Sequence, residues 1–402
     1  MKKVLVIGAG EFQLSGINKL REKGYYVIAV DGNPNPPGEN ISDEFYHIDV
    51  KDVSGILDLL EQKRITIEGC MCFAAEIALR TVAKINQKLN LNGLSLEDVH
   101  IATNKGKQRE LLKRASLPTP NFLRFKAGEI LDYELIGKAL QFPVIIKPVD
   151  SSGSRGVQVI HNLAELKENI GKSFNYSCFD SEIIIEEMIQ GIEFTVESFV
   201  TKDNIHTLSI SEKKKPTNNF TVSSELFYNS PFAMKLWDSI ENVVNRFIKE
   251  CNFKNTILHT EVLYSYSNQD IYIVETTVRS GGFGIFDKIL PRTTGLDIVG
   301  LTIDVNMGKE IFLETIERNP CILRFFNVNK GVLKNTIKFK DIIDQLIDIE
   351  YGFFVKPGES IGFFDSDGAR PGYMISYGKD WEAVFNKANL LEYAVRFDVA
   401  SF

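Results

Sequence analysis

The sequence lacks several features that would point to particular classes of protein. No apolar run is long enough to span a bilayer, which argues against an integral membrane protein. The apolar run after the basic N-terminus is too short for a signal peptide and passes into a glycine turn, so we expect a first strand and a cytoplasmic location. The formal net charge of −7 provides no basic surface for nucleic acid.

Cysteine and histidine are also scarce. The five cysteines form an odd, scattered set, which is not the pattern of a disulfide framework. Cys70 and Cys72 lie in the apolar run GCMCFAA, so we interpret them as core residues and not as metal ligands. The five histidines show no ligand spacing.

Length and composition indicate a folded chain with more than one core. The 402 residues exceed one ordinary hydrophobic core, so we expect two or three domains. Hydrophobic residues make up 44% and charged residues 25%, as is normal for a globular protein. From about residue 319 the pattern changes to short β-like runs separated by turns, which predicts a small α+β unit.

The first hundred residues predict an α/β unit. A buried strand over residues 2–8 leads through a glycine turn to a helix and to a second strand that ends in Asp31. This partly matches the dinucleotide fingerprint, but Gln13 stands where the third glycine belongs, so an NAD-dependent oxidoreductase is a distant alternative. Glu76 follows a later strand at its carboxyl end, where it either contacts a substrate or begins the next helix.

The stretch 259–282 combines two strand-like runs with an unusual placement of charge. If the runs pair antiparallel about the polar turn between them, Glu261 lies opposite Glu275 and His259 opposite Thr277. Two carboxylates directly opposite one another are unfavourable on a bare sheet. They make sense if they hold a divalent cation such as Mg²⁺. A solvated hairpin face in another register is the alternative.

A strand and a loop of small residues precede this hairpin. Residues 142–148 predict a strand that carries Lys147, and residues 151–156 read SSGSRG before a second strand. Backbone N–H groups and hydroxyls at such a tip can close over phosphates, with Lys147 adding charge beneath them. An ordinary flexible hairpin would have the same pattern, and the sequence does not match a P-loop.

Two further segments bear on ligand binding. Residues 183–187 predict an apolar strand that ends in two acids, and Met188 and Ile189 follow it. An apolar slot with carboxylates at its rim suits a nucleoside, although a half-exposed strand with solvated glutamates is the alternative. Residues 210–224 are basic and broken by proline, so we expect a loop that faces an anion or solvent.

Two helices frame these segments. Thr103 or Asn104 can cap a helix that ends before Pro118, because proline cannot continue it. Residues 232–251 place apolar side chains at helical spacing, which predicts a long helix with one buried stripe.

In this order, the segments resemble the ATP-grasp superfamily of carboxylate–amine ligases. The resemblance covers nearly the whole chain and implies α/β and α+β architecture. It implies a Rossmann-like domain over 1–102, an ATP-grasp body over 103–318 with a mobile lid at about 121–185, and a small C-terminal α+β cap over 319–402.

Individual motifs narrow the resemblance. His259-x-Glu261 and Arg279-x-Gly281-Gly282 are most similar to the L-amino-acid ligase branch and its carbamoyl-phosphate-synthase-like relatives. The strand around Lys147, by contrast, resembles biotin-carboxylase-like sequences.

The resemblance also implies the residues of an active site. For ATP it implies Lys105, Lys147, Ser151, Ser152, Gly153, Ser154, Gly156, Glu186, Glu187, Met188, Ile189 and Glu193. For Mg²⁺, with Mn²⁺ as an alternative, it implies Glu261, Glu275 and Thr277, the last standing where relatives usually carry asparagine. It implies catalytic roles for Arg279 and Lys147, and substrate contacts from Glu76, His259, Gly281 and Gly282.

The activity implied is ADP-forming ligation. A substrate carboxylate takes the γ-phosphoryl group of ATP, and an amine then attacks the acyl phosphate. The expected partners are a small carboxylate and a small amine, both amino-acid-like, without nucleic acid or membrane, and a homodimer is common among relatives. A non-catalytic ATP-binding homologue, and a carboxylase or purine-pathway-type enzyme, are the alternatives; the sequence carries no biotin-attachment segment.

Overall fold

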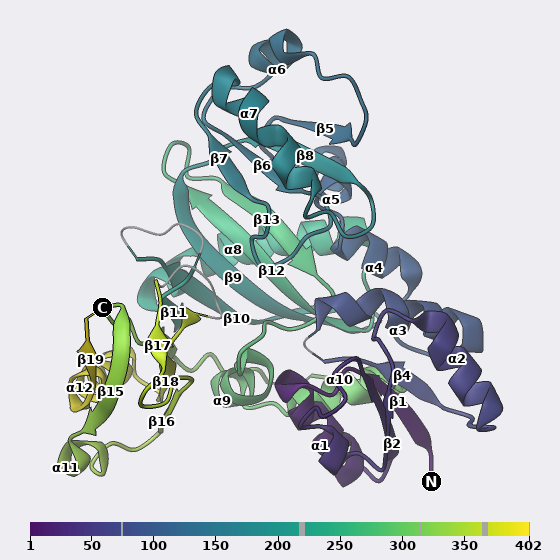
Figure 1. Cartoon of the computed structure of the whole chain (residues 1–402), viewed down its shortest axis with the longest axis vertical. Coiled ribbons are helices and arrows are strands. Elements are labelled where there is room, and N and C mark those ends of the chain that lie inside the picture. The colour runs from purple at the N-terminus through teal and green to yellow at the C-terminus, as the bar shows by residue number, and fades with distance from the viewer. Residues whose placement is uncertain (74, 217–221, 314, 364–368, 402) are drawn as a thin grey trace.

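The computed structural model describes residues 1–73, 75–216, 222–313, 315–363 and 369–401. Within these residues the strands form four sheets, one parallel and three antiparallel, with helices packed around them (Figure 1). The mixed α/β architecture expected from the sequence is therefore confirmed.

The N-terminal part contains the parallel sheet, in the order β3-β2-β1-β4. Its elements are β1 (Lys3–Ile7), η1 (Glu11–Gln13), α1 (Leu14–Glu22), β2 (Tyr26–Asp31), η2 (Glu39–Ile41), β3 (Glu44–His47), α2 (Val53–Gln62), β4 (Gly69–Met71), α3 (Glu76–Leu89) and α4 (Leu96–Ala102). Strands β1 and β2 are almost wholly buried, as expected for a parallel sheet covered on both faces. Helix α3 begins at Glu76 just after β4, so this residue lies at the carboxyl end of the sheet.

A four-stranded antiparallel sheet forms the lid, a name we use for the elements from β5 to β8. Its strand order is β5-β8-β6-β7. The elements are β5 (Phe122–Lys126), α6 (Tyr133–Ala139), β6 (Val144–Pro148), β7 (Gln158–Ile160), α7 (Leu163–Phe174) and β8 (Glu182–Glu187). The predicted pairing of β6 with β7 is confirmed, with Val144 opposite Ile160, so the small-residue loop connects two adjacent strands.

The central sheet has eight strands in the order β13-β12-β9-β10-β11-β14-β18-β16. The strands are β9 (Gly191–Val200), β10 (Ile205–Lys214), β11 (Glu225–Tyr228), β12 (Thr256–Ser265), β13 (Ile271–Thr277), β14 (Cys321–Phe325), β16 (Ile349–Phe353) and β18 (Gly372–Tyr377). The helical segments beside them are α5 (Lys105–Arg114), α8 (Pro231–Cys251), η3 (Ile285–Ile289), α9 (Leu290–Thr294) and α10 (Ile298–Asn306).

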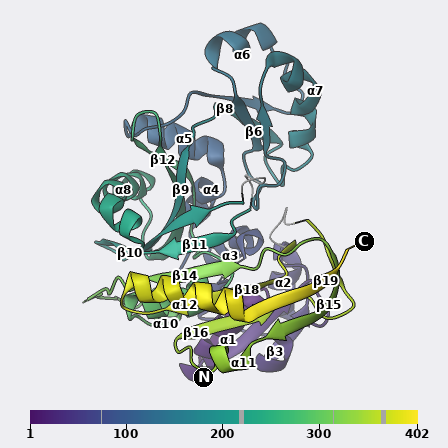
Figure 2. The ribbon, with the colours of Figure 1, turned by 90° about the vertical axis from the view of Figure 1, so that its left-hand side faces the viewer.

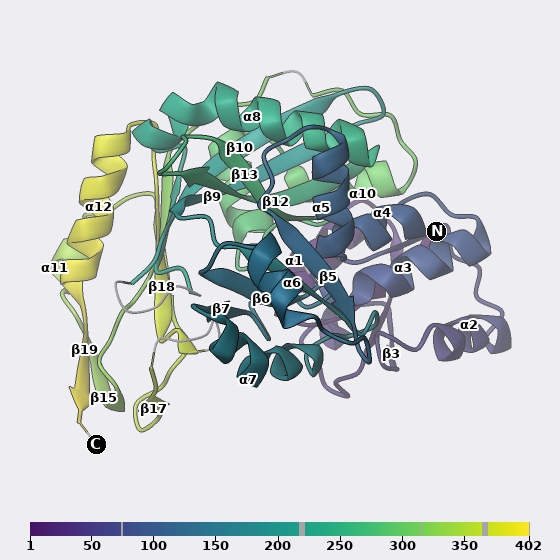
Figure 3. The same ribbon diagram turned by 90° about the horizontal axis from the view of Figure 1, so that it is seen from above.

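Helix α8 covers the apolar face of this sheet. The Ser230 side chain accepts a hydrogen bond from the N–H of Ala233 and so caps the helix. Pro231 is its first residue, a position that proline favours. Trp237 and Phe247 then pack into one core with Phe194 of β9 and with other apolar residues of β10, β12 and β13. Figures 1 and 3 show α8 behind these strands, with the lid above and in front of them. The polar face of the sheet is thus turned toward the lid.

One expectation about this region is wrong. The segment from residue 210 was expected to be a loop, but β10 continues to Lys214. Buried Leu208 and Ile210 alternate with Ser211 and Lys213, and this period-two pattern outweighs the basic composition. Residues 217–221 of the expected loop lie outside the described residues.

The C-terminal part shares the central sheet. Strands β14, β18 and β16 extend it beyond β11, while β15 (Gly331–Lys338), β17 (Ser360–Ile361) and β19 (Val395–Ala400) form a separate small sheet. Of its helices α11 (Lys340–Ile343) and α12 (Trp381–Ala394), α12 lies across β14 and β18 (Figure 2). The hydrogen-bonded sheet therefore runs across the expected boundary at 318/319, and the three-part division stays a prediction.

The N-terminal unit joins the rest through a shared core. Ile17 and Leu20 of α1 cluster with Ile298 and Ile303 of α10, which lies next to α1 in Figure 1. No described helix combines the length and the apolarity needed to cross a bilayer.

Candidate active site

One face of the central sheet carries a row of polar side chains. Strand β12 pairs with β13 in the register expected from the sequence, with Glu261 opposite Glu275 and His259 opposite Thr277. On its other side β12 pairs with β9, which places Glu197 opposite His259. The predicted register is confirmed, and the strand period of two puts these side chains on one face.

Two lysines flank the paired carboxylates. The Nζ atom of Lys105 lies 2.8 Å from Oε2 of Glu275, and Nζ of Lys213 lies 2.7 Å from Oε1 of Glu261. Burial alone would lower the pKa of the lysines, but the carboxylates beside them raise it above its usual value. Burial alone would raise the pKa of the two glutamates, and the charge of the lysines holds it below its usual value. All four groups are therefore charged at neutral pH.

The start of α5 places Lys105 between the sheet and the small-residue loop. Oδ1 of Asn104 accepts a hydrogen bond from the N–H of Lys107 at 2.9 Å, so Asn104 is the cap, one of the two residues predicted for it. Lys105 is the first helical residue, and its Nζ donates to the carbonyl of Ser151 at 2.7 Å. One lysine thus contacts both the β13 carboxylate and the loop that follows β6.

Both glycines of the small-residue loop have a positive φ, and a side chain at Gly156 would in addition clash with its neighbours. Gly156 has φ +77°, and a Cβ there would lie 2.9 Å from Pro148 and Tyr176. Gly153 has φ +65°, but a Cβ there would meet nothing within 4 Å. The Ser151 hydroxyl is buried and has no hydrogen-bond partner among the described residues.

A buried charge cluster lies beneath the loop. Lys147 of β6 pairs with Glu186 of β8, and Nε of Arg109 lies 2.8 Å from Oε2 of Glu186. Burial alone would raise the pKa of Glu186, but the charges of Arg109 and Lys147 lower it to about 2. The guanidinium of Arg109 also donates to the carbonyls of Ile273 and Val274, so it joins the lid sheet to β13.

The expected adenine segment links the lid to the central sheet. The Glu187 carboxylate accepts hydrogen bonds from the N–H of Gln141 at 2.8 Å and from the Asn121 amide at 3.0 Å. Met188 donates its N–H to the carbonyl of Pro143, and Met188 and Ile189 are half-buried between β8 and β9. Further along β9, Glu193 pairs with Lys215, and contact of these residues with a nucleoside stays a prediction.

Arg279 faces the N-terminal unit from the end of β13. Its Nη2 lies 2.9 Å from Oε2 of Glu76, so two residues predicted from distant segments meet. Nη1 donates to the carbonyl of Ser280, and the buried Nε has no hydrogen-bond partner in the described part of the chain. Glu76 therefore begins α3, as one of the two alternatives had it, and lies beside Arg279; its contact with a substrate stays a prediction.

Glu197 organises the loop after Arg279. Its side chain is fully buried, pairs with Nδ1 of His259, and accepts hydrogen bonds from the Ser280 hydroxyl and the Gly281 N–H at 3.2 Å. Burial alone would lower the pKa of His259, but Glu197 raises it to about 9. A Cβ on Gly281 would lie 2.9 Å from Oε1 of Glu197, whereas Gly282 faces open space.

Three residues of this arrangement were not among the sequence-based site residues. Lys213 could have been found from the sequence. It lies two residues after Ser211 on the same strand, so its side chain is on the same face as Ser211, which faces Thr195 in the polar row. Glu197 likewise shares the parity of Glu193 and Thr195 on β9. Arg109 has no local signal, since both of its partners lie far away in the sequence.

Comparison with known proteins agrees with this geometry. Residues 140–287 match the family model described as ATP-grasp domain, and they include Lys147, the loop, both strands of the hairpin and Arg279. This stretch of the chain is therefore similar to ATP-grasp domains.

The curated relative and the solved structures that the chain matches are distant in sequence, and the solved structures are similar in fold. The large chain of carbamoyl phosphate synthase from Clostridium acetobutylicum is 22% identical over 77% of this chain, which spans only 30% of that relative's length. The crystal structure of an L-amino acid ligase from Bacillus licheniformis has a TM-score of 0.82 at 20% identity, covering 100% of this chain and 99% of that one. The biotin carboxylase domain of a 2-oxoglutarate carboxylase from Hydrogenobacter thermophilus, a dimer solved with MgADP and bicarbonate, has a TM-score of 0.76 at 18% identity, covering 99% and 91%.

The donor atoms of this candidate site fit a divalent cation. Two ionised carboxylates face each other, and the buried hydroxyl of Thr277 has no hydrogen-bond partner among the described residues. Within those same residues, no three His, Cys, Asp or Glu side chains gather as a metal site. Mg²⁺ is commonly held by one or two carboxylates together with substrate phosphates and water, which suits two carboxylates and one hydroxyl.

The glycine turn of the N-terminal unit is filled by its own side chains. Oδ2 of Asp31 accepts a hydrogen bond from the N–H of Ala9 at 2.7 Å, and the carboxylate is thus turned into the turn. The buried Gln13 accepts from the N–H of Phe73 and lies against Gly8. A dinucleotide would need the N–H groups of the glycine turn and the carboxylate of Asp31. Asp31 and Gln13 already occupy this turn, which weighs against the oxidoreductase alternative.

Proposed function

We propose that the protein is an ADP-forming ligase that activates a small carboxylate as an acyl phosphate and couples it to an amine. The observation that carries the proposal is the face-to-face pair Glu261 and Glu275, flanked by Lys105 and Lys213 beneath the lid loop. This pair would hold Mg²⁺ with Thr277, and the bound ion would draw charge from the phosphates of ATP. The similarity in fold to an L-amino acid ligase supports the same reading.

The chain's own residues divide into two groups in this reaction. Lys105, which donates to the carbonyl of Ser151, and Lys147, on the strand before the loop, offset phosphate charge as an oxygen of the substrate carboxylate attacks the γ-phosphorus. The bond from that phosphorus to the bridging oxygen breaks, and ADP leaves. Arg279 offers guanidinium N–H groups, including the unpartnered Nε, to the acyl phosphate. The amine nitrogen then attacks the acyl carbon, releases phosphate and loses a proton.

A cavity beside Gly281 and Gly282 supports amino-acid-like substrates. It has a volume of about 210 Å³ and includes the rings of Phe283, Phe354 and Tyr373 in its lining. These rings pack on one another, with the Phe283 and Tyr373 centroids 5.0 Å apart. An apolar or aromatic side chain would be covered there, within reach of the loop that follows Arg279.

The same cavity has acidic groups for an ammonium. Glu11 and Asp287 lie in its lining, both are exposed, and neither has an ion-pair partner in the part of the chain that is described. Lys288 is also in the lining, but it is paired with Glu350. Two carboxylates without cationic partners beside aromatic rings favour a ligand with a positively charged amine.

Thr277 is the observation that favours a second candidate function, ATP binding without catalysis. Thr277 occupies the position where the resemblance implies asparagine, and a hydroxyl is a weaker metal ligand than an amide oxygen. A protein that binds ATP without transferring phosphate would tolerate this change. The two functions differ in a single measurable step, the release of ADP.

The deciding experiment is an ADP-release assay with pairs of amino acids, other carboxylates and amines, in the presence of ATP and Mg²⁺. We expect ADP release that depends on both substrates, and a ligated product of matching mass, with aromatic or apolar amino acids among the best substrates. Lys147→Met is the matched inactive control. ATP binding without ADP release on any pair would favour the non-catalytic function, and ADP release with bicarbonate alone would favour a carboxylase.

A further inference from the structure

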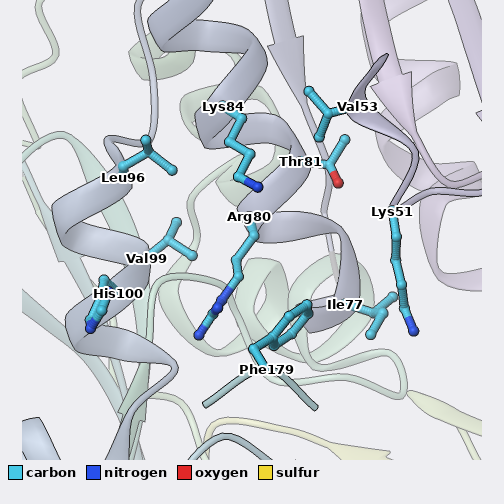
Figure 4. A pocket seen from close by; sticks show the side chains of 10 residues that line it. All are labelled: Lys51, Val53, Ile77, Arg80, Thr81, Lys84, Leu96, Val99, His100 and Phe179. Atoms are coloured by element: carbon cyan, nitrogen blue, oxygen red, sulfur yellow. The ribbon is translucent and has the colours of Figure 1, made fainter. Parts of the chain in front are cut away.

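A second cavity lies outside the residues used above. It has a volume of about 260 Å³ and is enclosed by α3, α4, the segment before α2 and the segment before β8. Figure 4 shows Arg80 and Lys84 extending from α3 into this space, with His100 on α4 beside them and Phe179 below. None of these residues contributes to the phosphate, metal or substrate contacts proposed above.

The cavity is basic in a chain whose net charge is −7. Three of its ten lining residues, Lys51, Arg80 and Lys84, are cationic, and none of the ten is acidic. Lys51 and Lys84 have no ion-pair partner in the described parts of the chain. Burial and the charge of Lys107 lower the pKa of His100, so its imidazole is neutral at pH 7 and offers both a donor and an acceptor.

The guanidinium group of Arg80 lacks one hydrogen-bond acceptor among the described residues. Its Nη2 is shielded from solvent and has no hydrogen-bond partner within the described residues. The ion pair with Oδ1 of Asp180 has an Nη2 to oxygen distance of 3.7 Å, too long for a hydrogen bond. The Phe179 ring lies 4.1 Å from the guanidinium carbon and holds it in place. Buried polar atoms are nearly always satisfied, so a guanidinium nitrogen without a hydrogen bond, on a residue that lines a cavity, points to a missing acceptor.

The rest of the wall is apolar. Val53, Ile77, Leu96 and Val99 line it together with Phe179. A bare inorganic ion would leave this surface uncovered, whereas a compact organic anion would use both the cationic side and the apolar side.

We propose that this cavity is a second ligand site, which binds a small organic anion through Arg80 and Lys84 and covers its apolar body with Phe179 and the α3–α4 surface. The anionic group is a phosphate or a carboxylate, because both offer the oxygen acceptors that a guanidinium and an ammonium bind.

An occupant of the cavity would contact both α3 and the segment that precedes the lid strand β8. Phe179 and Asp180 belong to the segment before β8, and their N–H groups donate to the Asp150 carboxylate at the end of the lid strand β6. Asp180 also accepts a hydrogen bond from the amide of Asn104, the residue that caps α5 beside Lys105. An anion on Arg80 would compete with Asp180 and would thereby reach the start of α5.

The test is calorimetric titration of the full chain with phenyl phosphate, benzoate, inorganic phosphate and the neutral probe benzyl alcohol. The nucleotide site is kept filled with ADP and Mg²⁺, and the titration is repeated in Lys147→Met. We expect at least one of the two anions to bind, benzyl alcohol not to bind, and inorganic phosphate to bind more weakly than phenyl phosphate. Binding should persist in Lys147→Met.

The variants decide where the anion lies. Arg80→Gln with Lys84→Gln should weaken binding at least tenfold, and Lys84→Gln alone, an exposed position that will not unfold the chain, should weaken it severalfold. Lys88→Gln, one turn further along α3 and also exposed, is the matched control and should bind as wild type. Loss of binding in Lys147→Met with no change in the α3 variants, equal binding of benzyl alcohol, or no anion binding would overturn the proposal.

Discussion

At the scale of single residues, Glu275 is the most direct test of the metal assignment. It shares the candidate cation with Glu261 and is paired with Lys105, so Glu275→Gln removes one charged ligand while keeping the shape. We expect ADP release to fall on the order of 100-fold or more and the Mg²⁺ concentration for half-maximal rate to rise. The rate and its Mg²⁺ dependence are measured together.

Asp270→Asn is the control for this variant, because it makes the same chemical change at the exposed turn of the same hairpin. It should leave both the rate and the Mg²⁺ dependence unchanged. A Glu275→Gln protein with the wild-type rate would remove the metal assignment, whereas loss of the circular-dichroism spectrum would show a folding defect instead.

His259 links the stability of the site to pH. Glu197 raises its pKa to about 9 in the folded protein, above the usual value of about 6.5. Folding thus favours the protonated form of His259. The contribution of this proton to the free energy of unfolding is fully present below about pH 6.5 and is lost as pH rises through about 9. This difference in pKa limits the contribution of protonated His259 to the free energy of unfolding to at most ~3.5 kcal/mol.

The measurement is the melting temperature of wild type and His259→Gln at pH 6 and at pH 9.5. We expect the difference between the two proteins to be largest at pH 6 and to shrink at pH 9.5. His161→Gln, at an exposed position in the lid, should show no pH-dependent difference. A His259→Gln difference that is equal at both pH values would mean that the ion pair with Glu197 does not form.

At the scale of elements, the lid depends on one buried carboxylate. Asp150 follows β6 and accepts hydrogen bonds from the Ser177 hydroxyl and from the N–H groups of Cys178, Phe179 and Asp180. Asp150→Ala leaves three backbone donors without acceptors, which should cost about 1–3 kcal/mol locally. We expect faster hydrogen exchange over residues 177–181 and weaker ADP binding.

Asp132→Ala provides the comparison within the same lid. Asp132 caps α6 by accepting from the N–H of Leu135, so its loss should loosen α6 without changing exchange at 177–181. If Asp150→Ala leaves exchange over 177–181 unchanged, the carboxylate does not hold that segment.

Prediction from the sequence succeeded where local patterns decide the structure. The register of β12 and β13 follows from alternation and the polar turn, and the cap of α5 follows from Asn104. It failed for Lys213, because a basic run before Pro216 resembles a loop while strand parity alone places the side chain beside Glu261. Arg109 and the pairing of β11 with β14 could not be predicted, since they depend on partners far away in the sequence.

At the scale of the whole molecule, polar contacts join the lid, the central sheet and α5, in addition to the apolar core that Leu112 of α5 shares with α8 and the sheet. Arg109 joins Glu186 of the lid to the carbonyls of β13, and Lys105 joins Glu275 to the loop at Ser151. A nucleotide held between these parts would add contacts that only the folded, assembled chain can make. Binding should therefore stabilise the entire fold by mass action.

We expect ADP with Mg²⁺ at a hundredfold excess over its dissociation constant to stabilise the chain by about 2.7 kcal/mol, measured as a rise of a few degrees in melting temperature. Lys147→Met should lower the size of this shift, whatever its own melting temperature, because the substitution removes the cation that we propose for a phosphate contact. NADH should cause no shift, since Asp31 and Gln13 already fill the glycine turn. A shift with NADH and none with ADP and Mg²⁺ would reverse the proposed function, because the ligand would then bind at the N-terminal sheet and not beneath the lid.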